Sequence, residues 1–261
     1  MNQTMTLSIC QFPIAFLDWQ TNKKMALQYI IQAKKEGADL IIFPEMTLTG
    51  ISKTVSAMAD VYGESITFFR SAATAHHIAI GFGFGKPIGE KLENHYTVID
   101  KSGTMLSDYV KLHPFTYGGE DLCFVRGNSF QTFSFNGFTA ATFICYDMRF
   151  PEIFQAASTE ADLILLCANW PASRSMHWKI LSQARAIENQ VYFAACNCIG
   201  DIGNLYYSGD SALYAPDGTI LKSLSDHSGL ITCTITNNVS AIRKGFPVKQ
   251  DRLTEYYRTI L

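Results

Sequence analysis

The sequence predicts an α/β fold, a four-layer α-β-β-α sandwich of two mixed sheets flanked by helices. Apolar strand-like runs alternate with segments of helical periodicity in both halves of the chain, which is typical of parallel strands joined by helices. Several hairpin signals lie between these units, and hairpins join antiparallel strands. Two mixed sheets stacked face to face accommodate both patterns, and we expect one domain covering residues 1–261.

The first half of the chain is expected to run strand, helix, strand, helix, strand and hairpin. Gly37 stops the first helical pattern, as a C-terminal glycine commonly does. Gly81, Gly83 and Gly85 alternate as strand residues do, which predicts close backbone packing rather than a nucleotide-binding loop. The expected ranges are 6–12, 21–36, 38–43, 65–77, 78–85 and, for the hairpin, 95–110.

The second half repeats the alternation and adds two hairpins. The first hairpin turns on Asn136-Gly137, the strongest short hairpin signal that a sequence offers. Pro151 can open a helix, because proline fits the first helical position. The last hairpin turns on Asp217-Gly218. The expected ranges are strands at 129–135 and 138–144, a helix after 151, a strand at 161–168, a helix at 175–189, a strand at 191–197 and a hairpin at 212–224.

The composition is that of an ordinary globular protein. With 48% hydrophobic and 17% charged residues and a net charge of -2, the chain can bury a large core and has no electrostatic attraction for nucleic acid or an anionic membrane. No apolar run approaches the roughly 18 residues that a membrane-spanning helix needs. Seven cysteines without a disulfide-rich spacing favour a reducing compartment, so we expect a cytoplasmic protein.

The sequence contains no strong metal or cofactor signal. Its histidines show no metal-ligand spacing, and Cys196 and Cys198 form a C-x-C pair in a core-like strand, where both thiols would face the same side. Such a pair without a second one is a weak zinc signal. We therefore expect no metal and no cofactor.

Three expected strands end in a charged or reactive residue: Glu45, Lys111 and Cys145. Strand ends can converge on one pocket although they are far apart in the sequence. Each residue taken alone also fits an ordinary role, as a solvated loop carboxylate, a surface lysine or a core thiol. Arg149 and the helix after Pro151 would favour the thiolate form of Cys145, which attacks carbonyl groups.

The stretches FPE at 43–45, VKLH at 110–113 and FICYDMRFPE at 143–152 together resemble the nitrilase, or carbon-nitrogen hydrolase, superfamily with its Glu-Lys-Cys triad. The resemblance covers nearly the whole chain. ANWPASRSMHW and ARAIENQVYFAACN are similar to the amidase branch, most of all its bacterial ω-amidase-like members, and IRKGFPVKQDRL is similar to the closing segment of the family.

The resemblance implies a mechanism for hydrolysing a small amide. Cys145 would be the nucleophile and Glu45 would move protons, which requires a largely desolvated pocket. Lys111 and the backbone N–H of Tyr146 would hold the oxyanion. Glu120, in TYGGEDLCF, matches a second glutamate of the family that positions the lysine or the substrate. A solvated loop carboxylate is the open alternative for Glu120.

Substrate specificity is expected from the loop after the strand at 161–168. Trp170 and the backbone of Asn169 would shape the acyl site, and Arg174 is a candidate partner for a substrate carboxylate. The alternative is an arginine tied to a structural acid, Asp147 or Glu152, which we prefer for Arg149. A pocket arginine would indicate 2-oxoglutaramate or 2-oxosuccinamate as substrates, with deaminated glutathione or N-carbamoyl compounds as the alternatives within the superfamily.

Two other function classes stay open. Cys145 could pair with His113 or His177 in a peptidase or acyltransferase, which would leave Glu45 and Lys111 without roles. The chain could also be a non-catalytic binding module. The resemblance further implies a homodimer that pairs through helices near the nucleophile. The sequence itself shows only that the helix at 175–190 has an apolar side, Trp178, Ile180, Leu181 and Ala184, that something must cover.

Overall fold

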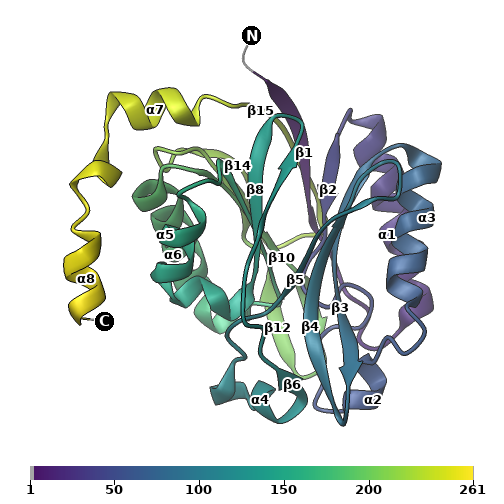
Figure 1. Ribbon diagram of the computed structural model, residues 1–261. Helices are drawn as coiled ribbons and strands as arrows, with labels where there is room; N and C mark the ends of the chain where they lie inside the picture. Colours follow the sequence, from purple (N-terminus) through teal and green to yellow (C-terminus); the bar gives the residue numbers. More distant parts are fainter. Residues whose placement is uncertain (1–2, 261) are drawn as a thin grey trace.

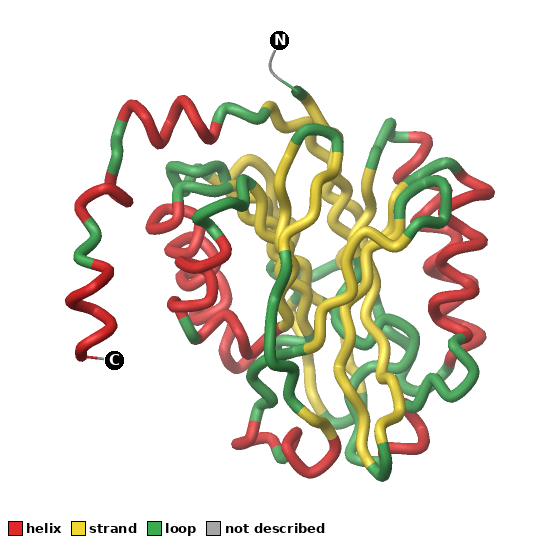
Figure 2. The backbone as a smooth tube through the Cα atoms, in the orientation of Figure 1, coloured by secondary structure: helices red, strands yellow, loops and turns green. Residues whose placement is uncertain are grey.

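Two sheets pack face to face in the computed structural model, which describes residues 3–260. Helices α1 (Trp19–Lys35) and α3 (Glu64–His76) cover the outer side of one sheet, and α5 (Pro151–Ala157) and α6 (Ser175–Asn189) cover the other (Figure 1). Figure 2 shows the strands as the inner layers and the helices as the outer ones. The predicted α-β-β-α sandwich is confirmed.

The first sheet has seven strands in the order β15-β1-β2-β3-β4-β5, with β6 paired to β4. Its strands β1, β2 and β3 run parallel, and its other neighbours along this order are antiparallel. Its strands are β1 (Thr4–Gln11), β2 (Leu40–Ile42), β3 (Ala79–Ile88), β4 (Lys91–Ile99), β5 (Met105–Val110), β6 (Phe124–Val125) and β15 (Gly229–Thr236).

The second sheet has six strands in the order β14-β13-β10-β9-β8-β7. The three strands β8, β9 and β10 are parallel, and hairpin partners flank them. Its strands are β7 (Thr132–Phe135), β8 (Phe138–Ile144), β9 (Leu163–Ala168), β10 (Tyr192–Asn197), β13 (Ser211–Tyr214) and β14 (Ile220–Leu224).

The alternation of side chains along β1 divides the core into two layers. Met5, Leu7 and Ile9 pack between the two sheets, whereas Cys10 and Phe12 pack under α1 and α3. Successive side chains of a strand point to opposite faces, so one strand serves both cores. Both layers are buried, which fixes the register of the sheet.

Residues with special turn or capping properties lie where the sequence predicts that helices and strands end. Asn136 and Gly137 both have positive φ, +43° and +78°, as the two-residue hairpin turn between β7 and β8 requires. Gly37 ends α1 with a φ of +82°. At the other end of α1, Asp18 accepts a hydrogen bond from Thr21 N at 3.0 Å.

Several elements were not predicted from the sequence. They are the hairpin of β11 (Ile199–Ile202) and β12 (Leu205–Ser208), strand β15, and the short helices α2 (Val55–Met58), α4 (Glu120–Cys123), α7 (Val239–Gly245) and α8 (Thr254–Ile260). Most are too short to show a period, whereas β15 does alternate as a half-buried strand should, so its signal was present and overlooked. Among the described residues, none of the helices combines the length and apolar character that crossing a membrane requires.

Candidate active site

The ends of β2, β5 and β8 bring Glu45, Lys111 and Cys145 together, and Glu120 joins them from α4. Lys111 Nζ lies 2.9 Å from Glu45 Oε1 and 2.8 Å from Glu120 Oε2. All four side chains are buried, with exposed fractions of 0% for Glu45 and 1% for Lys111. Glu120 is not a solvated loop carboxylate, the alternative interpretation of this residue. It is the first residue of α4, and it also accepts a hydrogen bond from Phe115 N. Such burial demands the close charge pairing that is present.

Cys145 sits at a sharp turn where β8 passes into the 3₁₀ turn η2 (Cys145–Arg149). Its φ is +48°, in the left-handed region that non-glycine residues avoid, so the turn must be held in place by other contacts. Asp147 supplies them, because its carboxylate accepts hydrogen bonds from Ile144 N, Tyr109 Oη and His113 N. The thiol points toward the carbonyl oxygen of Asn169, at 3.9 Å.

The carboxylate of Glu45 is held by three donors. Oε1 accepts from Lys111 Nζ and from Asn94 Nδ2 at 2.8 Å, and Oε2 accepts from the backbone N of Asn169 at 2.9 Å. A carboxylate oxygen has two lone pairs, so Oε1 is saturated and Oε2 keeps one free. Oε2 is therefore the oxygen that can take a further proton.

Burial and charge set the protonation of the lysine and the thiol. Burial opposes the charge of Lys111, but the neighbouring Glu120 and Glu45 raise its pKa well above the ordinary value. Burial, and then the charge of Glu45, raise the pKa of Cys145 well above that of a free thiol, and the charge of Lys111 only partly compensates. The expectation that its sequence neighbours favour the thiolate is therefore wrong for the resting protein, because desolvation dominates.

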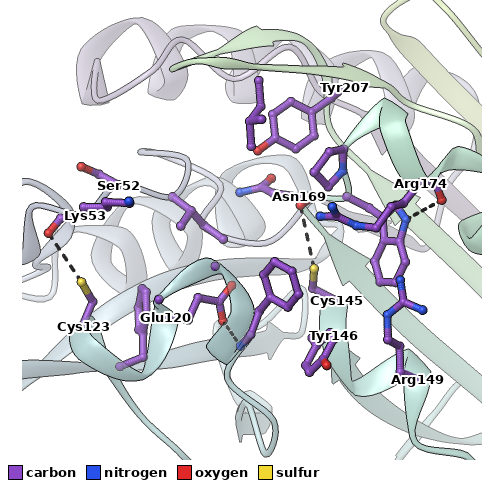
Figure 3. Close-up of a pocket in the computed structure, with 18 residues that line it drawn as sticks. Ser52, Lys53, Glu120, Cys123, Cys145, Tyr146, Arg149, Asn169, Arg174 and Tyr207 are labelled. Carbon is purple, nitrogen blue, oxygen red and sulfur yellow. Dashed lines mark hydrogen bonds between the residues drawn. The ribbon is translucent and has the colours of Figure 1, made fainter.

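A cavity of about 210 Å³ opens above Cys145 and takes in all the predicted substrate-binding residues (Figure 3). Tyr146, Asn169, Trp170 and Arg174 line it together with Cys145 and Glu120, whereas Glu45 and Lys111 are not among its lining residues. Its wall is largely aromatic and apolar. A cavity of this size with a few polar groups is typical of a site for a small molecule.

Two arginines reach the cavity. Arg174 lies over the ring of Phe115 at 5.2 Å, and its guanidinium has no ion pair within the described part of the chain. Arg149 lies over the ring of Trp170 at 4.9 Å and contacts His177 Nδ1 at 3.1 Å. The preferred interpretation of Arg149 as the partner of Asp147 or Glu152 is wrong, because the Asp147 carboxylate is taken up by its own turn.

The two rival histidines have other partners. His113 Nδ1 lies 2.8 Å from Asp147 Oδ1 and its ring stacks on Phe150, so it supports the turn below Cys145 without lining the cavity. His177 contacts Arg149. The thiols of Cys196 and Cys198 do not share one side as expected, since β10 ends between them and they pack in different core layers.

Sequence reasoning missed several residues of the site, including Asn94, Asn197 and Tyr207. Asn94 donates to Glu45, Asn197 fixes the loop after β9 by accepting from Trp170 N at 2.8 Å, and Tyr207 lines the cavity from β12. Asn197 ends a strand of otherwise plain core sequence, and Asn94 lies in a strand between two other polar residues, Glu93 and His95. Only their buried amides, which must find partners, could have suggested a role.

Comparison with known proteins agrees with this architecture. Residues 6–244 match the carbon-nitrogen hydrolase family. The 2-oxoglutaramate amidase of Bacillus subtilis is 32% identical over 258 residues, which are 97% of this chain and 99% of that protein. The omega-amidase YafV of Yersinia enterocolitica is 34% identical and covers 83% of this chain and 84% of its own.

Solved structures of similar proteins have the same fold. XC1258 of Xanthomonas campestris, a CN-hydrolase superfamily protein with an arsenic adduct in its active site, superposes with a TM-score of 0.89 at 27% identity and covers 95% of this chain and 97% of its own. A mutant amidase of Nesterenkonia sp. AN1 in complex with acrylamide gives 0.87 at 25%, covering 98% and 97%. The chain belongs to the carbon-nitrogen hydrolase family of the nitrilase superfamily, and it is an amidase that hydrolyses C–N bonds.

Proposed function

We propose that the enzyme is an ω-amidase that releases ammonia from a short 2-oxo dicarboxylic acid monoamide, 2-oxoglutaramate or 2-oxosuccinamate. The observation that carries the proposal is Arg174, a guanidinium in the cavity wall without an acidic partner among the described residues. A planar guanidinium binds a carboxylate through two parallel hydrogen bonds. Relatives at about one-third identity named 2-oxoglutaramate amidase and omega-amidase support the same substrate class.

In the proposed mechanism, Cys145 transfers its proton to Oε2 of Glu45 as its sulfur attacks the amide carbon. Lys111 Nζ and the N–H of Tyr146 stabilise the oxyanion. Glu45 then gives the proton to the departing nitrogen, the C–N bond breaks, and ammonia leaves a thioester on Cys145. Glu45 next takes a proton from water, which attacks the thioester, and that proton returns to the sulfur as the carboxylic acid is released. Glu120 keeps Lys111 charged and in place.

The charges around the cavity also favour an oxo acid over an amino acid. Glu120 is paired with Lys111, and Glu45 already has three donors. Within residues 3–260, no carboxylate without a partner lines the cavity, whereas two cationic side chains, Arg149 and Arg174, do line it. The ammonium group of glutamine would therefore be desolvated beside cations, whereas a 2-oxo group brings no charge. We expect glutamine to be a poor substrate.

The test is steady-state release of ammonia from 2-oxoglutaramate, compared with glutamine, deaminated glutathione, an N-carbamoyl amino acid and an aliphatic nitrile. 2-Oxoglutaramate should have the highest kcat/KM. Replacing Arg174 by Met keeps the stem over Phe115 but removes the charge, which should cost about 2 kcal/mol or more in kcat/KM, at least about 30-fold. Absence of any preference for 2-oxoglutaramate would sink the ω-amidase proposal.

The roles of Glu45 and His113 can be separated by substitution. In the proposed mechanism Glu45→Gln abolishes turnover, whereas His113→Ala weakens only the turn that Asp147 builds. A Cys/His enzyme would give the opposite result, with Glu45→Gln active and His113→Ala inactive.

We also propose a homodimer formed through α6 in a reducing, cytoplasmic setting. Met176, Ile180 and Ile187 are exposed on α6 by 70%, 59% and 51%, while Trp178 of the same helix is fully buried. Such an exposed apolar face is common at interfaces between copies. Light scattering should give twice the chain mass, and Ile180→Lys should give the monomer. A monomeric wild-type protein would refute the dimer.

A further inference from the structure

Tyr207 is a largely buried tyrosine of the cavity wall. It lies on β12, directly opposite Gly200 of β11, and is only 6% exposed. Its hydroxyl forms no hydrogen bond within residues 3–260, although its side chain lines the cavity with Cys145 and Arg174 (Figure 3). Burial, the largest cause, raises its pKa, so the hydroxyl keeps its proton and remains a hydrogen-bond donor at neutral pH.

The side-chain amide of Asn169 is the second unpartnered group. The backbone of Asn169 is committed, since its N donates to Glu45 and its O accepts from Cys145. Its Oδ1 and Nδ2 are both buried and have no partner in the part of the chain that the structure describes, although the side chain lines the cavity. Buried amides are rarely left unpaired, because losing water without a replacement is costly. A bound molecule is the natural partner.

Both groups lie close to the arginine assigned to the substrate carboxylate. In Figure 3, Asn169 lies between Tyr207 and Cys145, with Arg174 alongside. Strand β12 packs against the 3₁₀ turn η3 (Ala172–Arg174) that carries this arginine. The wall next to Arg174 thus offers neutral donors, whereas the wall near Cys145 offers the catalytic groups.

We propose that the Tyr207 hydroxyl and the Asn169 side-chain amide form a neutral subsite that binds the 2-oxo group of the substrate. The inference rests on the proposed ω-amidase function and goes beyond it by assigning recognition of the oxo group. In a 2-oxo acid this carbonyl is bonded directly to the carboxylate, so its subsite must adjoin Arg174. A ketone oxygen only accepts hydrogen bonds, and Tyr207 Oη–H and Asn169 Nδ2–H both donate. Asn169 Oδ1 is then available to an N–H of the scissile amide.

The subsite predicts discrimination between two nearly identical amides. Glutaric acid monoamide has the carboxylate and the scissile amide of 2-oxoglutaramate but lacks the oxo oxygen. It would leave the buried Asn169 Nδ2–H and the Tyr207 hydroxyl in the cavity without the acceptor that the oxo group supplies, and a site built to hydrogen-bond a substrate group rejects the analogue without it. We expect wild-type kcat/KM for 2-oxoglutaramate to exceed that for the monoamide by about 10-fold to 100-fold or more.

The test compares this ratio in Tyr207→Phe and in the neighbouring Tyr206→Phe. Tyr206 is 49% exposed and does not line the cavity, so it is a matched control for loss of one hydroxyl from the same strand. Tyr207→Phe should lower the ratio about tenfold, mainly through kcat/KM for 2-oxoglutaramate, and Tyr206→Phe should not change it. Tyr207→Phe should likewise lose affinity for the product 2-oxoglutarate but not for glutarate, measured by calorimetry.

Each outcome is decisive. An equal loss on both amides would show that Tyr207 supports the fold and would overturn the subsite. A wild-type enzyme that hydrolyses both amides equally well would also overturn it, while leaving the amidase with its carboxylate site. A wild-type enzyme that hydrolyses neither would refute the proposed function together with the subsite.

Discussion

Gly83 controls the position of Glu45, although it lies on a different strand. A Cβ on Gly83 would lie 2.6 Å from the backbone N of Met46 and 3.1 Å from Glu45 Cα. The backbone of Gly83 also makes two hydrogen bonds to Thr47, in the loop that carries Glu45. Thr47 N donates to the Gly83 carbonyl at 2.9 Å, and Gly83 N donates to Thr47 Oγ1 at 3.0 Å. The variant Gly83→Ala must therefore push the loop away from β3.

The size of the effect follows from these distances. Ordinary contacts of a Cβ begin at 3.4 Å, so a contact at 2.6 Å requires a retreat of about 0.8 Å. A misplacement of about 1 Å at a catalytic group costs on the order of 100-fold in rate. Overpacking costs about 1–3 kcal/mol of folding free energy in addition, which for a domain of this size lowers Tm by roughly 2–12 °C.

The assay measures kcat for ammonia release and Tm for Gly83→Ala and Gly85→Ala. At Gly85 the added Cβ would meet Leu92 Cδ1 at 2.9 Å and Met58 O at 3.0 Å. Gly85→Ala therefore causes a similar overpacking, but it does not press on the backbone of Glu45. We expect both variants to lose stability, but only Gly83→Ala to lose about 100-fold in kcat. Equal kcat values for the two variants at equal Tm would refute the argument that Gly83 positions Glu45.

Two further predictions concern the groups around Glu45. Asn94→Leu removes one donor to Glu45 Oε1 and also removes Asn94 Oδ1, a buried oxygen without a partner among residues 3–260. It should lower kcat about 10-fold to 100-fold, because Glu45 loses a hydrogen bond that positions it. Tm should change little, because the apolar side chain also removes the energetic cost of burying an unpaired oxygen. A parallel fall of Tm and kcat would contradict this expectation. Glu45→Gln removes the negative charge that raises the pKa of Cys145, so the thiolate should form at a lower pH than in the wild type. The ultraviolet absorbance of the thiolate measures this change. Amide turnover should be lost in the same variant. An unchanged thiol pKa would count against direct coupling of the two groups.

The sequence predicted the parts of the site that lie at strand ends. Glu45 and Cys145 each follow an apolar run, Lys111 follows the second strand of a predicted hairpin, and parallel or mixed sheets bring such strand ends together at one edge. The two-residue hairpin at 136–137 and the helix at 175–189 could likewise be predicted, because their signals are local. A residue's position at the end of a predicted strand was therefore enough to place it in the site, because the backbone of the sheet brings these ends together.

The remaining features depend on contacts between distant segments. Tyr207 enters the cavity from a hairpin of four-residue strands with no periodic pattern. Asn94, on β4, reaches Glu45, which follows β2, across the intervening strand β3. The protonation of Cys145 could not be predicted either, because its sequence neighbours Asp147 and Arg149 turn out to have other partners. Burial and charges brought in from other strands outweigh those neighbours.

The raised pKa of Cys145 fits its proposed role once the buried charges are counted together. Ionised Glu45 and Glu120 with protonated Lys111 leave one net negative charge beside a neutral thiol. Losing the thiol proton to solvent would add a second buried negative charge, which desolvation opposes. Passing the proton to Oε2 of Glu45 leaves the net charge of the cluster unchanged, so the thiolate forms without that penalty. The nucleophile would then arise only as the proton moves within the cluster, and the resting thiol would be protected from adventitious electrophiles.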